Sequence, residues 1–204
     1  MLDQIIPFLT ASILLTFSPG PDIIYVLVRS MAFGYKQGIV TALGLVSGIL
    51  IHTSLVAFGI SAIIKQSESI YLIIKILGGI YLLYLAYQVY KSDPEIAFTS
   101  EGIKQKSPGR LFRQGFVMNV LNPKVSIFFL AFFPGFLWDP EGNTVAQFYI
   151  LGALFMLQAL IIFSFVAVAA GKISKYIKSH PKSGFFMKWM QFIIFILIAM
   201  LILI

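Results

Sequence analysis

The stretch TFSPGPDII, Thr16 to Ile24, interrupts an otherwise almost wholly apolar run near the start of the chain. Proline removes a helical amide donor and its ring clashes with the preceding turn, so Pro19 and Pro21 predict a break in a helix. Gly20 between them permits close approach of another group, and Asp22 follows at once. A kink that serves helix packing is the alternative interpretation, but a kink does not need a charge. The stretch therefore predicts a functional site in an interrupted helix.

The composition places this helix in a membrane. Hydrophobic residues make up 59% of the 204 residues, charged residues 11%, and the mean hydropathy is +0.92. A soluble domain of this size does not present so much apolar surface. The absence of cysteine excludes disulfides and thiolate metal sites, and the two histidines, His52 and His180, are far apart in the sequence. We therefore expect an integral membrane protein with no metal and no cofactor.

Six segments are long enough to cross a bilayer, for which a helix needs about 20 apolar residues. They predict an all-α transmembrane domain over residues 1–204, because lipid-facing backbone must satisfy its hydrogen bonds internally. The only long hydrophilic stretch, the linker 91–110, divides the chain into halves of about 1–90 and 111–204. The segments are Ile5–Val28, Ile39–Ile64, Ile70–Tyr90, Leu111–Trp138, Val145–Ala170 and Phe185–Ile204.

The basic residues predict the orientation. Twelve of the 15 lysines and arginines lie in or beside the first, third and fifth connections, all on the same side of the predicted bundle. The positive-inside rule places these connections and the linker 91–110 in the cytoplasm, and both termini outside. The net charge of +7 is then a topology signal. Nucleic acid is not an expected partner, whereas the lipid bilayer is.

A second break occurs in the fourth segment. The stretch MNVLNPKVS, Met118 to Ser126, contains Asn122-Pro123-Lys124 where the first half contains Ser18-Pro19. Serine and asparagine are favoured N-caps, and proline is favoured at the first helical position. Because three helices per half is an odd number, the two halves enter the membrane from opposite sides. We therefore predict two inverted three-helix repeats, each with an interrupted first helix.

The inverted arrangement predicts a binding site. The half-helices that start at Pro19 and Pro123 run in opposite directions, so their positive N-terminal ends face one another near mid-membrane and attract anionic groups. Asp22 and Lys124 add one charge of each sign. Paired interrupted helices are the best sequence indication of a transporter site. Donors, freed carbonyls and both charges suit a zwitterion, and free amino acids are the obvious candidates. The predicted substrate-binding residues are Ser18, Pro19, Gly20, Pro21, Asp22, Asn122, Pro123 and Lys124.

These motifs resemble the LysE/RhtB family of amino-acid exporters. The resemblance rests on SPGPD, GIVTALGLVSGILIH, KILGGIYLLYLAYQVYKS and FRQGFVMNVLNPKVSIFFLAFFPGF, and covers most of residues 1–137. It implies export of amino acids or derivatives across a bacterial plasma membrane, driven by the proton gradient. The chain departs from the family pattern at Gly135, where glutamine is common, and in a last helix without the usual glycines. These departures bear on substrate range and on the packing of that helix.

Further roles are assigned to single residues. Asp22 and His52 are candidates for proton coupling, although Asp22 also suits the substrate ammonium or neutralisation of Lys124, and His52 also suits a packing hydrogen bond. We expect close helix packing at the glycines Gly44, Gly48, Gly78 and Gly79.

Three other classes of function compete with transport. A passive channel would use the same polar groups without dependence on the proton gradient. An intramembrane enzyme would need a catalytic set, and Ser18, Asp22 and His52 form no recognised motif. A purely structural scaffold does not explain the buried charges, since each costs roughly 2.5–3.5 kcal/mol at a helix centre. We therefore predict an exporter that works by alternating access and is not an enzyme. Assembly into a homo-oligomer stays open.

Overall fold

The structure, a computed structural model, describes residues 2–60, 68–93, 104–180 and 182–203. Every regular element in these ranges is a helix, as the sequence predicts. The long helices and half-helices are α1 (Leu2–Phe17), α2 (Pro21–Phe33), α3 (Tyr35–Leu55), α5 (Glu68–Lys91), α6 (Pro108–Val120), α7 (Pro123–Ile127), α8 (Thr144–Ser179) and α9 (Ser183–Leu203). The π-helical turns η1 (Val56–Ile60) and η2 (Phe128–Phe132) continue α3 and α7, and the 3-10 turn η3 (Phe133–Phe136) follows η2.

Four helical segments are long and apolar enough to cross a membrane: 35–59, 69–91, 144–177 and 183–203. Two further spans are obtained if each bent helix pair is one span. These pairs are α1 with α2, bent by 55°, and α6 with the segment Pro123–Phe136, bent by 48°. The described residues thus contain four to six candidate spans, which overlap the six predicted segments. The predicted end of the second segment, Ile64, and much of the linker 91–110 lie outside the described residues.

The first break differs in register from the prediction. Ser18 still belongs to the end of α1, because its amide donates to Leu14 O at 2.9 Å. The new helix starts at Pro21 with Gly20 as an extended N-cap residue (φ −172°, ψ 176°), not at Pro19 with Ser18 as the cap. Both prolines fit a first helical position, but the hydrogen bond of Ser18 continues the last turn of α1 to the residue that a helix starting at Pro19 would need as its cap. The start predicted at Pro19 is therefore wrong by two residues.

The second break has the predicted chemistry. The side-chain oxygen of Asn122 accepts a hydrogen bond from the Lys124 amide at 3.1 Å, and Pro123 is the first residue of α7. Upstream, the Leu121 amide still donates to Val117 O at 3.0 Å, which ends α6. The asparagine cap thus starts a new helical direction within a few residues of the last turn of α6.

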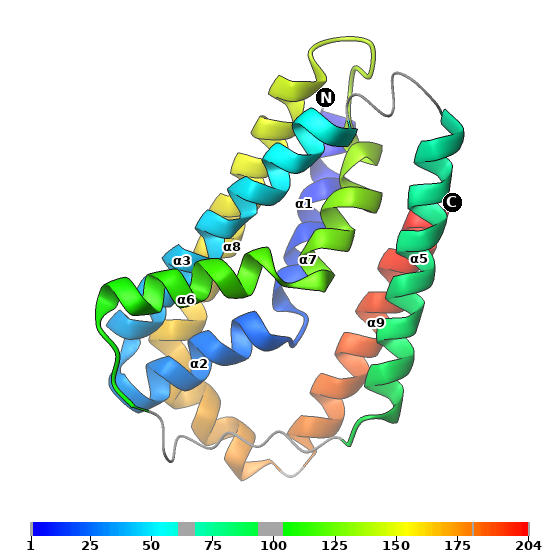
Figure 1. Cartoon of the computed structure of the whole chain (residues 1–204). Coiled ribbons are helices and arrows are strands. Elements are labelled where there is room, and N and C mark those ends of the chain that lie inside the picture. The colour runs from blue at the N-terminus through cyan, green and yellow to red at the C-terminus, as the bar shows by residue number, and fades with distance from the viewer. Residues whose placement is uncertain (1, 61–67, 94–103, 181, 204) are drawn as a thin grey trace.

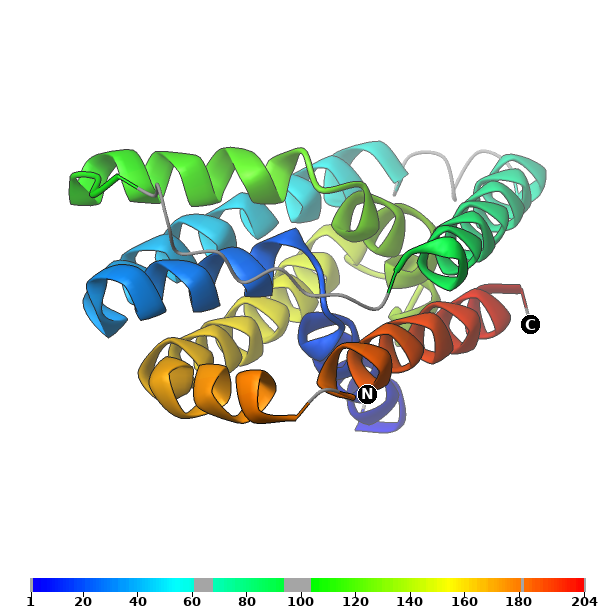
Figure 2. The same cartoon turned by 90° about the horizontal axis from the view of Figure 1, so that it is seen from below.

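The helices alternate in direction along the molecule (Figure 1). In that view α1 descends to the middle and α2 continues to the lower left, whereas α6 enters from the left and α7 turns upward at the middle. Helix α3 packs on α6 and α8, and α5 packs on α9 as a separate pair (Figure 2). The two breaks therefore lie near the centre of the molecule, between the α3–α6–α8 group and the α5–α9 pair.

Helix α8 is longer than the predicted segment Val145–Ala170, because it runs on to Ser179. The sequence from Gly171 to Ser179 contains no proline, so nothing interrupts the helix before His180. His180 is extended (φ −119°, ψ 101°), as expected for a residue that precedes a proline. The lysines that follow Ala170 therefore begin on a helical extension of the span.

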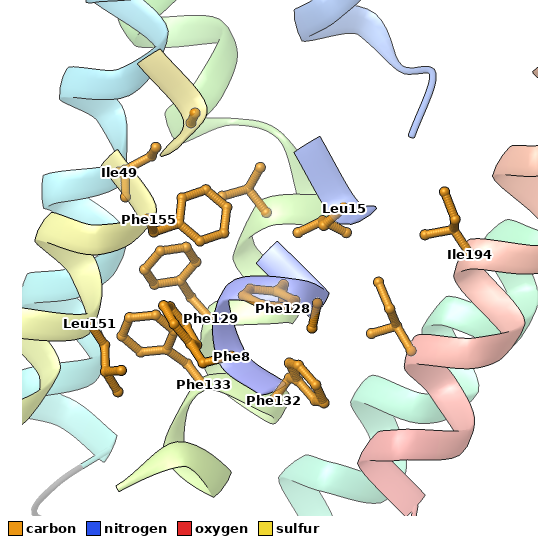
Figure 3. Packing of buried hydrophobic residues seen from close by; sticks show 14 of the residues in the cluster. Phe8, Leu15, Ile49, Phe128, Phe129, Phe132, Phe133, Leu151, Phe155 and Ile194 are labelled. Carbon is orange, nitrogen blue, oxygen red and sulfur yellow. The ribbon is translucent and has the colours of Figure 1, made fainter. Parts of the chain in front are cut away.

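A phenylalanine cluster holds the upper half-helices together (Figure 3). Phe8 of α1 contacts Phe133 edge-to-face at 5.2 Å between ring centroids, and Phe129 stacks on Phe133 at 4.3 Å. Phe155 of α8 closes the cluster against Phe129 at 5.2 Å. The phenylalanines of η2 and η3 are therefore core residues, whereas Phe112 of the same predicted segment is exposed. Because the cluster joins α1, η2 and α8, it holds in place the helical segments that lie next to the two breaks.

Glycines allow the closest helix contacts. A methyl group at Gly44 would overlap the Phe112 carbonyl oxygen on α6, and one at Gly48 would lie 2.7 Å from Asn119 Oδ1. The same holds for α5, where Gly78 faces Ala131 and Gly79 faces Leu203 of α9. Small residues let helix backbones approach in this way. Gly48 matters most for the interior of the molecule, because it sets the position of the buried Asn119.

Candidate functional site

The two breaks touch each other through Lys124. This residue is the second of α7, and its ammonium group donates to the main-chain oxygen of Ser18 at 3.0 Å. In an unbroken helix that oxygen would accept from the amide four residues later, that of Asp22. The break releases it, and a cation from the other half of the chain takes its place. The predicted meeting of the two interrupted helices is thus a direct contact between their ends.

Asp22 lies on the first turn of α2 and is 8% exposed. Its Oδ2 accepts from the Asn119 amide at 3.3 Å, whereas its Oδ1 is buried and has no hydrogen-bond partner. Lys124 was the partner expected from the sequence. The two charged groups line one cavity, but their hydrogen bonds go to Asn119 and Ser18 instead.

His52 joins the same group of residues from α3. Its Nε2 lies 3.1 Å from Asn119 O, and its ring packs 5.6 Å from that of Phe129. Because Asn119 contacts His52 through its main chain and Asp22 through its side chain, the three residues form one chain of contacts. Both residues named for proton coupling are therefore linked through Asn119.

A small central cavity lies between the breaks. Its volume is about 30 Å³, enough for one or two water molecules but not for an amino acid. Seven residues of its lining are polar or belong to the breaks, and the other lining residues are apolar, among them Leu15 and Phe155 (Figure 3). The former set is Thr16, Ser18, Gly20, Asp22, Asn119, Asn122 and Lys124. Pro19, Pro21 and Pro123 act on the cavity through the backbone they redirect.

Several polar atoms around the cavity have no partner within the described residues. They are Ser18 Oγ, Asp22 Oδ1, Asn119 Oδ1 and Gln158 Oε1. Burying an unpaired polar atom costs about 1–3 kcal/mol, so four of them in one place are not explained by packing. All four can accept a hydrogen bond. Together they suit a donor-rich group such as an ammonium.

Three residues at the site, Thr16, Asn119 and Gln158, were missed by the sequence reasoning. Asn119 bridges His52 and Asp22, and Gln158 of α8 donates to Thr16 Oγ1 at 3.0 Å. The missed signal is a lone amide within an apolar helix, because polar residues inside a membrane mark functional sites by default. Asn119 lies within the quoted MNVLNPKVS and could have been named on this ground.

The described residues contain no group of three or more His, Asp or Glu side chains that could hold a metal ion. The chemistry of the site is therefore that of one carboxylate, one ammonium, several amides and hydroxyls, and two helix N-termini. Such groups bind and reorient a small polar solute.

Comparisons with known proteins find relatives along most of the chain. The sequence model of the family described as "LysE type translocator" matches residues 13–204. A "Homoserine/homoserine lactone efflux protein" of Salmonella typhimurium is 32% identical over 175 residues, which cover 86% of this chain and 84% of that protein. A protein of Salmonella typhi with the same description is 33% identical, again covering 86% of this chain and 84% of that protein.

An "Uncharacterized membrane protein" of Vibrio cholerae is 28% identical over 84% of this chain and 83% of its own length. No solved structure matches the chain significantly. The family match spans both breaks and the helices that position them. The chain is a multi-pass membrane protein that belongs to the LysE type translocator family.

Proposed function

We propose that this protein exports small amino acids, or closely related solutes, from the cytoplasm across a bacterial plasma membrane. The observation that carries the proposal is the contact between the two helix breaks, where Lys124 donates to Ser18 O beside a cavity with unpartnered polar atoms. Interrupted helices that meet in this way are typical of transporter sites. The eight residues predicted from the sequence, with Asn119, Thr16 and Gln158 added, form the proposed binding site.

The charges support an amino acid as the substrate. Lys124 and the N-terminal end of α7 suit a carboxylate, whereas Asp22 Oδ1 and the neighbouring amide oxygens suit an ammonium. Two relatives are described as homoserine/homoserine lactone efflux proteins. A small neutral amino acid such as homoserine is therefore the substrate we propose to test first.

The contacts of Asn119 support coupling to protons. Asp22 and His52 are two ionisable groups held by one residue, at 3.3 Å and 3.1 Å. Either group can take up a proton from one side of the membrane and release it on the other. A proton on Asp22 would also weaken its hold on a substrate ammonium, which links proton binding to substrate release.

The size of the cavity supports alternating access. Because about 30 Å³ does not hold an amino acid, the site has to widen during transport. In the mechanism we propose, the two halves are inverted repeats, each bent pair is one span, and one three-helix unit rocks against the other around the breaks. Both termini then lie outside, with the lysine-rich connections in the cytoplasm. Figure 1 agrees with this, since both chain ends lie in its upper half.

The test is efflux of homoserine from loaded cells and loaded vesicles that contain the protein. Lys124→Ala removes the link between the breaks, and Pro19→Ala restores a helical donor at the first break, so both should abolish efflux. Lys175→Ala, on the exposed end of α8, is the matched control and should export normally. All three variants should insert to equal levels. Normal export by the Lys124 and Pro19 variants would remove the proposed site.

The passive channel is the rival within the same site. An uncoupler added to the loaded vesicles should stop uphill export by a proton-coupled transporter. If the flux through the protein only follows the homoserine gradient, with or without the uncoupler, the channel interpretation is right.

A further inference from the structure

A second, larger hollow runs along α2 from its first residue, Pro21, to Arg29. Its volume is about 430 Å³, within the range of roughly 300–1,000 Å³ typical of small-molecule sites. Helix α2 contributes one continuous face to it, the residues Pro21, Ile24, Tyr25, Val28 and Arg29. Met118 of α6 and the cations Lys104 and Lys106 complete the lining. We call this hollow the vestibule.

Arg29 is the unusual residue of the vestibule, because its charged side chain is fully buried. Its guanidinium donates to Lys104 O at 2.9 Å and to Gln37 Oε1 at 3.0 Å, and its Nε has no partner. The group also lies 4.8 Å from the ring centroid of Phe33. Within the part of the chain that the structure describes, this buried cation contacts only neutral groups, an arrangement that is costly unless an anion joins it.

The other two cations also lack an anionic partner among the described residues. The Lys106 ammonium donates to Gln114 Oε1, again a neutral acceptor. The Lys104 side chain is exposed at the mouth, while its main-chain oxygen is the one that Arg29 holds. Three positive charges thus surround one opening. Their combined potential attracts an anionic group into the vestibule.

The position of the vestibule indicates which anion enters. Its inner end is Pro21, which lies between Gly20 and Asp22 of the central cavity. Arg29 follows Asp22 by seven residues, about 10 Å along the helix axis. The two hollows thus lie on different faces of the first turns of α2. One amino acid does not span the distance from Asp22 to Arg29, so a solute would occupy the vestibule and the cavity one after the other.

We propose that Lys104 and Lys106, with the charge of the buried Arg29 behind them, form a loading site that binds the substrate's carboxylate before the substrate reaches the cavity. This inference rests on the proposed function for its direction and goes beyond it in naming a second subsite. It predicts that solutes with a free carboxylate bind in the vestibule better than otherwise similar solutes that lack one. Homoserine and homoserine lactone are such a pair, because the lactone keeps the ammonium and has no carboxylate.

The first experiment measures the vestibule without transport. The chain has no cysteine, so Val28→Cys, or Met118→Cys if that variant inserts poorly, gives a single thiol in the vestibule. Its rates of modification by a sulfonate and by a quaternary-ammonium methanethiosulfonate are compared in phosphatidylcholine vesicles. Adding Lys104→Gln with Lys106→Gln should lower the sulfonate-to-ammonium rate ratio roughly three- to tenfold, as expected for partly screened charges. Lys104→Gln keeps the main-chain oxygen that Arg29 needs, and Lys175→Gln is the control that should leave the ratio unchanged.

Two further arms decide what the anion is. Homoserine should slow the modification, whereas homoserine lactone should not. Equal protection by the two, or a ratio that the double substitution leaves unchanged, would overturn the loading site. Repeating the comparison in vesicles that contain phosphatidylglycerol tests a lipid headgroup. If the effect of the lysines disappears there, a lipid phosphate occupies the vestibule and the proposal is wrong.

The second experiment uses transport. In vesicles loaded through the cytoplasmic face, the double glutamine variant should raise KM for homoserine roughly three- to tenfold and leave KM for the lactone within about twofold. Parallel rises for both solutes would contradict the loading site. Charge-dependent labelling without any efflux would contradict the proposed export and leave the loading site standing. The two proposals thus fail separately.

Discussion

At the scale of single residues, the site depends on amide side chains, which find few alternative hydrogen-bond partners inside a membrane. Asn119 holds Asp22 with its side chain and His52 with its main chain. Gln158 donates through its nitrogen to the cavity residue Thr16, and its buried oxygen has no partner. A residue that keeps one half of its hydrogen-bonding capacity unused in the interior is available to a ligand.

Gln158 allows this idea to be tested against a residue of the same type on the same helix. Gln158→Leu should raise KM for homoserine and lower thermal stability in detergent less than Gln147→Leu does, because it loses one hydrogen bond, to Thr16 Oγ1, and its oxygen has no partner to lose. Gln147→Leu should do the reverse. Gln147 accepts from the Trp138 and Asp139 amides, both at 3.0 Å, so its loss should cost about 1–3 kcal/mol per stranded group. Thermal melting and efflux kinetics of both variants decide the matter, and equal destabilisation by both would contradict a binding role for Gln158.

Asp22 carries the prediction on proton coupling. Asp22→Asn keeps the size of the side chain and removes the titrating group. We expect the variant to lose efflux driven by a proton gradient while it still exchanges labelled for unlabelled homoserine across vesicles. Loss of exchange together with gradient-driven efflux would instead assign Asp22 to substrate binding alone. Wild-type protein in the same vesicles supplies the reference rates.

At the scale of elements, helix α3 positions the site by its contact with α6. The glycine face of α3 allows α6 to approach so closely that Gly48 lies directly against Asn119. The break at Asn122 then turns the chain toward α7, and the phenylalanine cluster keeps α7 and η2 in place. A cavity between two helix ends is only as well defined as the packing behind those ends.

Gly48→Ala tests this support. The added methyl group would lie 2.7 Å from Asn119 Oδ1 and 2.9 Å from its Cβ, so Asn119 has to move. We expect a strong fall in efflux, at least tenfold for a shift that costs on the order of 1.4 kcal/mol, and a lower melting temperature. Gly171→Ala on α8 is the matched control, because a methyl group there meets no atom within 4 Å. Equal activity of both variants would show that the α3–α6 contact does not position the site.

At the scale of the whole molecule, both ends of the chain lie on one side in Figure 1, and the lysine-rich end of α8 lies on the other, as does the end of α5 at Lys91. This agrees with an even number of crossings and with the positive-inside rule. The α5–α9 pair stands apart from the group formed by α3, α6 and α8 (Figure 2). The breaks lie where these two groups meet. Each group combines helices of both halves of the chain, so the groups are not the two three-helix units of the proposed repeat.

The orientation has a direct test, because the chain contains no native cysteine. Glu141→Cys, at an exposed position in the turn before α8, should react with an impermeant thiol reagent added outside intact cells. A cysteine at Lys175, on the exposed end of α8, should react only after the cells are opened. The reverse pattern would place the lysines outside and overturn both the predicted topology and the cytoplasmic position of the vestibule.

Much of the site can be predicted from local sequence chemistry. Proline and an asparagine cap act within a few residues, so the break at Asn122 could be placed to the residue. At the first break two prolines compete for the first helical position, and the prediction placed the start at Pro19 instead of Pro21. Asn119 and Gln158 could not be assigned partners, because the partners lie on helices far away in the sequence.

The sequence by itself determined that the chain is helical, apolar enough for a membrane, and broken at two matching points, because hydropathy, proline and capping act over short distances. Only the tertiary structure decided that Lys124 binds Ser18 O rather than Asp22, that Asn119 joins Asp22 to His52, and that Arg29 is buried beside two lysines. Those contacts join residues up to 106 positions apart. They depend on how whole helices pack, which no local sequence pattern can predict.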